Sequence, residues 1–469
     1  MEHRGASKSC RLIAEPGALA SSSAAQFAHL RGLEVRNCSS SESLASSSTT
    51  DDSLIAVSFA NVAQMPARER AQLRSAVEGG ATLYLRGAIG EGVRVQLAPL
   101  VDASFSVGCV PSATTYRLTL HPLIPAVLRG EMNPFGDALN CAFGLAAEAE
   151  PILLVRDGSG TEFPVIFACR VGRGAIICDL QPDANSDIPL IWRLADPTQR
   201  CANISALIAA DRAAGRDVSR PVPFNLTIDD VPLPYDYFNE SILEKFLAHL
   251  DRRYADNHLD CAWIPSSQWM SRRYVDILKS HGVGFLWHGI HQHVDHQKIA
   301  NPTAEMETGK RAMASNAARY GVKLQPMIIF PYERAHLSAE RLLLDEGFIA
   351  GAEQPRNDEG IADTPRYLQY CDAWCAHESG LRFLHRYEAP FLTRDRMLAI
   401  AAMGMPILAF AHPKDVRLRR LSRFLERGGT YAHFDEVLDF AAAKNLPGRS
   451  LAEIARQMFD PKTHSANAA

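Results

Sequence analysis

The second half of this 469-residue chain alternates short apolar runs with helical segments, and this alternation most limits what the chain can fold into. The strand-like runs are "PFNLTID", "LDCAWIP", "VGFLW", "PMIIFP", "FIAGA", "GLRFLHRYE" and "PILAFAH". Helical periodicity between and after them predicts helices near 239–254, 267–280, 303–319, 338–346, 394–403 and 415–427. About seven strands, each followed by a helix or a loop, predict a (β/α) barrel, in which functional groups lie at the carboxyl ends of strands.

The first 200 residues or so predict a separate α/β domain, since the chain is too long for one typical core. "LIAVSF", a helix in "PARERAQLRSAVEGG" and "ATLYLRG" predict a βαβ unit, and "FPVIFACRVG" with "GAIICDL" predicts a β-hairpin. The Ser/Thr-rich stretch 36–53 is predicted to be a solvated loop. We therefore expect domains over 1–205 and 220–469, joined by the polar span "AADRAAGRDVSRPVP".

Composition excludes several classes of protein. With 49 basic and 53 acidic residues the formal charge is −4, so we expect no nucleic-acid partner. No signal peptide and no run of eighteen apolar residues is visible, which predicts a cytoplasmic protein without a membrane span. The ten cysteines form no C-x-x-C pair and are predicted to be reduced core thiols; Cys371 and Cys375 could meet on one helix face, a weak metal or redox signal. The oligomeric state stays open.

Polar side chains stand at the ends of four predicted strands. Asp229 and Asp230 end the first strand, His288 ends "GFLW", the tripeptide 331–333 follows "MIIF", and His412 ends "ILAFA". Adjacent aspartates before Val-Pro also suit an ordinary turn. A turn does not account for histidines at the other strand ends, so we predict a functional site on one rim of the barrel.

The types of side chain at this rim point to hydrolysis of an amide. One carboxylate and two imidazoles are the ligand set of a divalent metal that keeps open positions; zinc suits it, and cobalt, nickel or iron would fit. Such a metal makes a water more acidic and polarises a carbonyl oxygen. A second carboxylate can take a proton and another imidazole can protonate the leaving nitrogen. The sequence therefore predicts a metal-dependent hydrolase of a linear amide C–N bond.

Four motifs carry a family resemblance over about residues 220–445. "TIDDVP" resembles the T-F-D-D-G-P motif of the polysaccharide deacetylases, the NodB-homology or carbohydrate esterase 4-like group, whose fold is a distorted (β/α)7 barrel. "HGIHQHVDH", "IIFPYERAHLSAERLLLDEGF" and "PILAFAHP" resemble its later motifs in order and spacing. The resemblance implies that Asp229 is the general base, that Asp230 and two histidines of 288–296 bind the metal, and that His412 is the general acid.

The histidine motif departs from the family pattern. The family's two ligating histidines are four residues apart, whereas His288, His291, His293 and His296 are separated by two, three, five and eight residues. We prefer His288 with His293, because His288 directly ends the strand and "HVDH" resembles the family's continuation; His291 is the alternative ligand. The glycine of the first motif is Val231 here, which indicates a different backbone course or a bulkier pocket wall.

Substrate contacts are predicted in two segments. "FPYER" stands where the family has an arginine-bearing proline run, and "CDAWC" resembles the family's aspartate and tryptophan before the last motif. We therefore predict substrate-binding side chains at Tyr332, Glu333 and Trp374, with Arg334 and Asp372 as further candidates.

The remaining charged and histidine residues are given ordinary roles. Arg386 and Glu388 in "LHRYE" could line the rim, but we favour a surface ion pair. Other histidines are interpreted as surface or hydrogen-bonded residues, namely His249, His281, His336 and His433.

The N-terminal domain resembles the degenerate glutamine-amidotransferase-like domains found beside carbohydrate enzymes, through "VEGGATLYLRG" and "CRVGRGAIICDL". An active amidotransferase needs a cysteine in a G-x-C-x-G elbow. "VGCVPS" around Cys109 lacks the second glycine, so we interpret Cys109 as structural and the domain as a packing or substrate-shaping module.

These observations predict an α/β protein that removes an N-acyl group, in particular N-acetyl, from an amino sugar or a sugar-containing substrate. The alternative is a catalytically inactive barrel that binds carbohydrate or scaffolds an assembly, and an intact metal site would distinguish the two. A deformylase or an amidase for a non-sugar amide would share the mechanism and differ only in its pocket.

Overall fold

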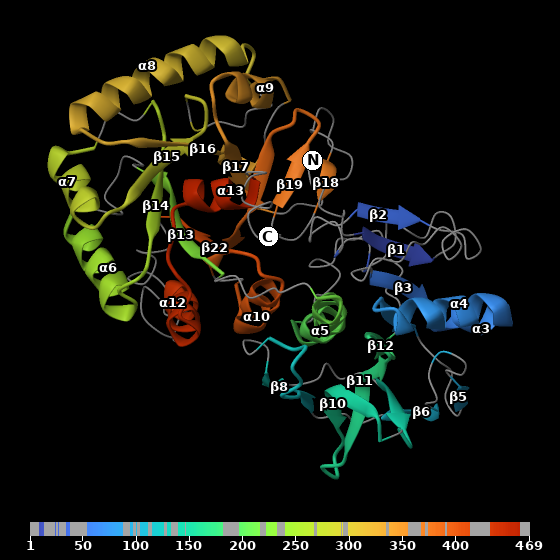
Figure 1. The fold of residues 1–469 in the computed structure, drawn as a ribbon. Coiled ribbons are helices and arrows are strands. Elements are labelled where there is room, and N and C mark those ends of the chain that lie inside the picture. Colours follow the sequence, from blue (N-terminus) through green and yellow to red (C-terminus); the bar gives the residue numbers. More distant parts are fainter. Residues whose placement is uncertain are drawn as a thin grey trace, which may run out of the picture. The chain divides into compact units, whose positions relative to one another are not determined.

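The computed structural model describes residues 9–13, 24, 27, 34–37, 54–87, 94–96, 100, 104–110, 115–125, 129–132, 139–145, 147–181, 197–215, 222–231, 240–266, 270–291, 293, 299–333, 337–354, 367–370, 374–389, 392–412 and 432–459. The chain divides into two compact units (Figure 1). The first comprises Met1–Arg220 with Ala402–Gly404, and the second comprises Pro221–Ala401 with Met405–Ala469.

The first unit contains a nine-stranded sheet with the order β2-β1-β3-β4-β12-β11-β10-β7-β8 and a three-stranded sheet with the order β5-β6-β9. Its strands are β1 (Ser9–Ile13), β2 (Glu34–Asn37), β3 (Leu54–Ser58), β4 (Thr82–Arg86), β5 (Arg94–Gln96), β6 (Ser104–Val110), β7 (Thr115–Leu118), β8 (Gly130–Met132), β9 (Leu139–Phe143), β10 (Ala149–Arg156), β11 (Glu162–Val171) and β12 (Gly174–Asp179). Its helices are α3 (Phe59–Gln64), α4 (Ala67–Glu78) and α5 (Pro197–Ala213).

The βαβ unit and the hairpin predicted for the first unit are confirmed. β3 and β4 pair in parallel, and the connection holds α3 and α4. Leu73, Ala76 and Val77 recur at helical spacing on α4 and are buried in the core of this unit, which is why this face packs on the sheet. β11 and β12 pair antiparallel, and Gly172 turns between them with φ of 57°. Cys109 lies inside strand β6.

The second unit is built on a ten-stranded sheet with the order β18-β19-β20-β17-β16-β15-β14-β13-β22-β21. Its strands are β13 (Phe224–Val231), β14 (Leu259–Trp263), β15 (Gly284–His288), β16 (Leu324–Ile329), β17 (Ala350–Glu353), β18 (Tyr367–Tyr370), β19 (Trp374–His377), β20 (Arg382–His385), β21 (Tyr387–Glu388) and β22 (Ile407–Ala411). Helices are α6 (Glu240–Arg253), α7 (Arg272–Ser280), α8 (Pro302–Tyr320), α9 (Leu337–Asp345), α10 (Arg394–Ala402), α12 (Ala432–Lys444) and α13 (Leu451–Phe459), with the 3-10 turn η3 (Pro331–Glu333).

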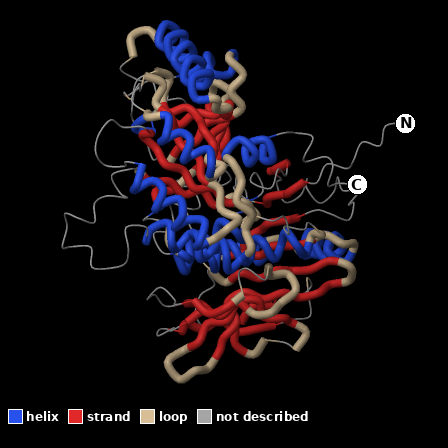
Figure 2. The backbone as a smooth tube through the Cα atoms, turned by 90° about the vertical axis from the view of Figure 1, so that its left-hand side faces the viewer, coloured by secondary structure: helices blue, strands red, loops and turns tan. Residues whose placement is uncertain are grey.

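This sheet is curled, and its helices α6, α7 and α8 run along its outside (Figures 1 and 2). Strands β13 to β17 pair in parallel with their neighbours, as strands joined by helices do. The segment 382–388 pairs with β17 through β20 and with β22 through β21. One short segment therefore links both flanks of the parallel strands, and the change of partner falls at Arg386.

Helix α13 packs its apolar face against one side of the sheet. Leu451, Ala452, Ile454 and Ala455 share a buried cluster with residues from six strands, including Leu286 of β15 and others from β14, β16, β17, β20 and β22. The buried Asp260 fixes the start of this helix, because its Oδ2 accepts the backbone N–H of Leu451 at 2.8 Å. The face of the sheet that carries this cluster is called the inner face below.

Two details of the second unit differ from the sequence-based expectation. Residues 374–377 form strand β19 and not a helix, so Cys375 does not lie on a helix face; Cys371 lies outside the described residues. β18 and β19, which the sequence reading missed, form an antiparallel hairpin on β20. The helix expected over 415–427 also lies outside the described residues.

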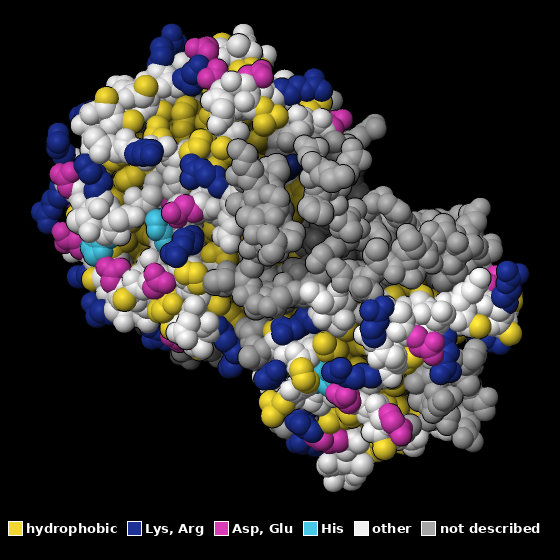
Figure 3. All heavy atoms as spheres, in the orientation of Figure 1, with side chains coloured by type: hydrophobic (Ala, Val, Ile, Leu, Met, Phe, Trp, Pro, Cys, Tyr) yellow, Lys and Arg dark blue, Asp and Glu magenta, His cyan; other side chains and the backbone are white. Residues whose placement is uncertain are grey.

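The described residues contain no helix long and apolar enough to cross a membrane. On the face of the molecule in Figure 3, basic and acidic side chains of the described residues alternate over the surface of the second unit. That face shows no patch of a single charge among them, in keeping with the balanced composition.

Candidate active site

A β-bulge at the end of β13 brings two adjacent aspartates to the same face of the sheet. Ile228 pairs with Cys261 and Val231 with Trp263, so β13 has one residue more than β14 across this interval. Asp230 adopts a left-handed conformation with φ of 57°, which an aspartate tolerates better than most residues. In a regular strand neighbouring side chains would point to opposite faces, and the bulge removes that restriction.

His288 ends β15 on the inner face, since it lies two residues after Leu286 of the inner cluster. Its Nδ1 lies 3.1 Å from the backbone oxygen of Ile329, and its Nε2 lies 2.8 Å from Oδ1 of Asp230. A carbonyl that accepts from one ring nitrogen fixes which nitrogen points at the ligand position, as is usual for histidines that bind metals. Buried His288 is therefore held in a single orientation toward Asp230.

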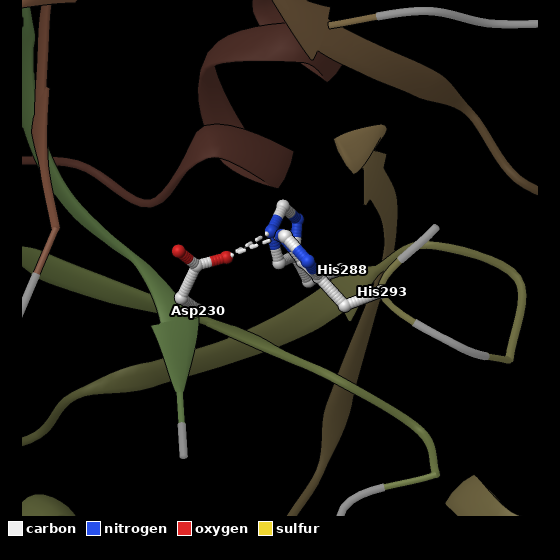
Figure 4. A group of neighbouring side chains, drawn as sticks. All are labelled: Asp230, His288 and His293. Carbon is white, nitrogen blue, oxygen red and sulfur yellow. Dashed lines mark hydrogen bonds and ion pairs between the residues drawn. The ribbon is translucent and has the colours of Figure 1, made fainter. Parts of the chain in front are cut away.

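His293 approaches the same carboxylate from the loop after β15 (Figure 4). Its Nε2 lies 2.7 Å from Oδ1 of Asp230, and its ring centroid is 5.1 Å from that of His288. His291 turns elsewhere, because its Nδ1 contacts Oε2 of Glu305 on α8 at 2.9 Å. The structure thus brings His288 and His293, and not His291, to Asp230; His296 lies outside the described residues.

This donor set fits a divalent metal ion. The three potential ligand atoms lie within 4.8 Å of one another, and the set of two imidazoles with one carboxylate is the one that catalytic zinc sites use. Burial alone would raise the pKa of Asp230, but hydrogen bonds and positive charge from His288 and His293 hold it below its ordinary value. An ionised Asp230 between two imidazole nitrogens is the state that ligates a cation.

Arg386 forms a buried ion pair with Asp229. Its Nη1 donates to Oδ1 of Asp229 at 2.7 Å, and the two residues are 1% and 2% exposed. The guanidinium also lies 4.1 Å from the ring centroid of Phe410 on β22. The prediction of a surface ion pair for Arg386 was wrong, because Arg386 lies two residues after Leu384 of the cluster packed on α13, so strand alternation directs its side chain to the inner face.

Of the other predicted residues, His412 and Tyr332 lie close to Asp229, Asp230 and the two histidines, whereas Trp374 lies against α13. His412 directly follows β22. Because Ile228 pairs with Ala411, the next residues of the two strands, Asp229 and His412, lie side by side. Tyr332 is 58% exposed, its ring centroid lies 5.3 Å from that of His293, and its φ of 57° is sparsely populated for an aromatic residue. Glu333 ends η3, and Trp374 packs edge-on against Phe459 of α13. Arg334 and Asp372 lie outside the described residues.

Gly309 of α8 packs against the loop that follows β15 and carries His291 and His293. A Cβ at this position would meet the backbone oxygen of Ile290 at 1.8 Å, far inside the contact distance. We expect Gly309→Ala to destabilise the protein by about 1–3 kcal/mol through overpacking, although alanine favours a helix by up to about 1 kcal/mol. The displaced loop should also weaken metal binding, measured by titration of the metal-free protein with zinc.

The matched control for that substitution is Gly158→Ala. Gly158 has no atom within 4 Å of a Cβ position, so the same change there should leave stability and metal affinity unaltered. Equal metal affinity in Gly309→Ala and wild type would show that the loop yields without moving His288 or His293.

Comparison with known proteins yields matches to solved structures only, since no family model and no curated protein matches the chain. A family 4 carbohydrate esterase from Streptomyces lividans matches with a TM-score of 0.31 and 12% identity, over 49% of this chain and 93% of that one. The chitin deacetylase of Colletotrichum lindemuthianum matches with a TM-score of 0.30 and 10% identity, over 50% and 88%. A β-galactosidase from Rahnella sp. R3 reaches 0.29 and 10%, over 46% and 33%.

Proposed function

We propose that the chain is a metal-dependent hydrolase that removes an N-acyl group, in particular N-acetyl, from an amino sugar or a related sugar-containing substrate. One observation carries this proposal: adjacent aspartates at one bulge serve two different partners. Asp230 meets His288 and His293, whereas Asp229 meets Arg386. This division of partners supports a role for Asp230 in holding a cation and a role for Asp229 in proton transfer.

The proposal gives each side chain a separate task in the reaction. A divalent ion held by Asp230, His288 and His293 would supply Lewis-acid chemistry, polarising the acyl carbonyl and making a water more acidic. Asp229, oriented by Arg386, takes a proton from the attacking water as its oxygen bonds to the carbonyl carbon. His412 gives a proton to the nitrogen as the C–N bond breaks, so that a carboxylate and an amine leave.

The chemistry of the rim and the sequence resemblance together support the proposed substrate class. Tyr332 offers an exposed aromatic face beside His293, which suits the apolar face of a sugar ring. Glu333 and Trp374 remain proposed contacts from the sequence. Zinc is the proposed ion, because two imidazoles and a carboxylate suit it. The (β/α)7 barrel and an N-terminal amidotransferase-like domain, acting as a packing or substrate-shaping module, are also parts of the proposal.

Metal content and acetate release test the proposal together. We expect Asp230→Ala, His288→Ala and His293→Ala each to lose one equivalent of metal and the release of acetate from N-acetyl sugars. Losing a residue that only supports a metal ligand typically lowers metal affinity by roughly 10–100-fold. Removing a ligand itself should lower the affinity by at least as much. Metal analysis of the purified variants and an acetate assay give the two readouts.

His291→Ala is the matched control, because His291 lies in the same loop but contacts Glu305. It should keep both the metal and the activity. If wild type binds no ion at Asp230 after zinc or cobalt is supplied, the hydrolase is excluded and the inactive carbohydrate-binding barrel becomes the better interpretation. If the ion is present but only non-sugar amides are cleaved, the substrate class is wrong and the mechanism stands.

A further inference from the structure

A second cluster of potential metal ligands lies on the outer face of the sheet. Glu353 ends β17 and pairs with His385 at the end of β20, so the two side chains share a face. Cys375 of β19 pairs with Phe383, two residues before His385, and His377 follows two residues after Cys375. The strand alternation therefore directs a carboxylate, a thiol and two imidazoles to the same place.

Ligand atoms of Glu353, Cys375 and His385 all lie within 4.8 Å of one another, and His377 contacts two of these residues. Sγ of Cys375 lies 3.1 Å from Oε1 of Glu353 and 3.4 Å from Nε2 of His377. The same Oε1 lies 3.5 Å from Nε2 of His377 and 3.9 Å from Nε2 of His385. Bonds of about 2.0–2.3 Å to a tetrahedral ion imply separations of about 3.3–3.7 Å between ligand atoms. These four distances lie within a few tenths of an ångström of that range.

Glu340 of α9 orients the imidazole of His377 toward the cluster. Its Nδ1 lies 2.7 Å from Oε1 of Glu340 on α9, and Ser379 Oγ donates to Oε2 of the same carboxylate at 2.6 Å. Glu340 is fully buried, and the imidazole of His377 also stacks on Phe383 at 4.4 Å. A carboxylate that holds one nitrogen of a histidine so that the other points at a shared position is typical of metal sites.

This cluster is separate from the candidate active site. Ala352 and Leu384, the neighbours in sequence of Glu353 and His385, belong to the inner cluster packed on α13. Arg386, the next residue after His385, points to Asp229 on the inner face. Consecutive residues of one segment thus serve two sites on opposite faces of the sheet.

We propose that Glu353, Cys375, His377 and His385 bind a second divalent ion, zinc, in a closed structural site. A thiolate, two imidazoles and a carboxylate favour zinc over the hard cations magnesium and calcium. All four residues are buried, at 0–5% exposure, and four protein ligands complete a tetrahedral shell. The site therefore holds the fold together and takes no part in the hydrolysis proposed above.

The ion would tie the β18–β19 hairpin to the strands that position Arg386. β19 contributes two ligands, whereas β17 and β20 contribute one each. The backbone N–H of Arg386 also donates to the carbonyl of Glu353 at 2.9 Å. Without an ion the same groups form a buried ionic network: burial lowers the pKa of His377, but Glu340 and Glu353 raise it to about 9. That metal-free network is the rival to be tested.

X-ray absorption at the zinc edge and metal analysis of the full chain separate the two interpretations. We expect about two equivalents of zinc in wild type. The zinc in the second site should have a sulfur neighbour at about 2.3 Å. Asp230→Ala should keep one equivalent of zinc. Because all of this zinc would lie in the second site, the sulfur contribution per zinc ion should be larger than in wild type. Cys375→Ala should lose the sulfur signal and one equivalent, while Cys261→Ala, which removes another buried thiol of the same unit, should change neither.

The variant pair also keeps failure of this site distinct from failure of the hydrolase. A zinc edge of wild type and Asp230→Ala with only nitrogen and oxygen neighbours would overturn the second site, whatever the activity. So would a sulfur signal that survives Cys375→Ala. Because the wild-type spectrum needs no substitution, a variant that fails to fold does not remove the test. Cobalt loading gives a second readout, a thiolate-to-metal absorption that only Cys375→Ala should abolish.

Discussion

Asp229→Asn is expected to lower kcat for amide hydrolysis by about 100- to 10,000-fold and to leave the metal content unchanged. The amide keeps the size of the carboxylate but cannot take a proton from the attacking water, and general-base catalysis contributes a factor of that order. Asp230→Asn should instead lose metal and activity together, because Asp230 meets His288 and His293. Initial rates of acetate release, measured beside metal content, separate the two aspartates.

A surface aspartate serves as the control for this pair. Asp251 contacts His281 near the surface at 2.7 Å, and Asp251→Asn should change neither rate nor metal. Loss of metal from Asp229→Asn with retention in Asp230→Asn would reverse the roles of the two carboxylates. Retention of full activity in Asp229→Asn would require another base, and the proposed mechanism would be wrong.

The strand ends of the second unit could be predicted because its strands are recognisable in the sequence as short apolar runs. "FNLTID", "GFLW" and "ILAFA" each end at a polar side chain, and parallel strands bring their carboxyl ends to one rim. The sequence favoured His293 over His291 through the resemblance of "HVDH", and His291 stayed the alternative ligand. That choice depends on Gly289, whose φ is 78°, and on Glu305, which contacts His291 from a helix fourteen residues away.

Arg386 shows why a sequence pattern misses a buried ion pair. Its partner Asp229 lies 157 residues earlier, and an arginine after a strand is most often at the surface. Strand alternation from Leu384 puts Arg386 on the inner face, and the pairing of β21 with β22, the neighbour of β13, brings it near Asp229. The inner side of this segment is known only from the packing of Leu384 in the cluster with α13, so residue type alone does not reveal that Arg386 is buried.

The outer cluster was missed for a related reason. "WCAH" is a four-residue strand, too short for alternation to be recognised, and a helical interpretation of 371–375 separated Cys375 from His377. Read as a strand, the spacing Cys-x-His puts both side chains on one face. That alternation was the usable signal, although the contributions of Glu353 and His385 depend on tertiary pairing.

Arg386→Met is expected to destabilise the second unit by about 3–5 kcal/mol, because it leaves the Asp229 carboxylate buried without its cation. Methionine roughly keeps the apolar volume beside Phe410, so the loss is mainly electrostatic. The double variant Asp229→Asn with Arg386→Met removes both charges and should recover a large part of that loss. Urea unfolding of the four proteins, wild type included, gives the coupling free energy between the two residues.

An exposed pair of the same chemistry supplies the comparison. Arg253 and Asp439 also form an arginine–aspartate ion pair, but their side chains are 39% and 56% exposed. Arg253→Met should therefore cost about 1 kcal/mol or less. Because the two arginines lose the same charge, a much larger loss at Arg386 isolates the effect of burial. Equal losses at both positions would mean that water reaches Asp229, and that Arg386 does not hold the proposed base in a dry, fixed orientation.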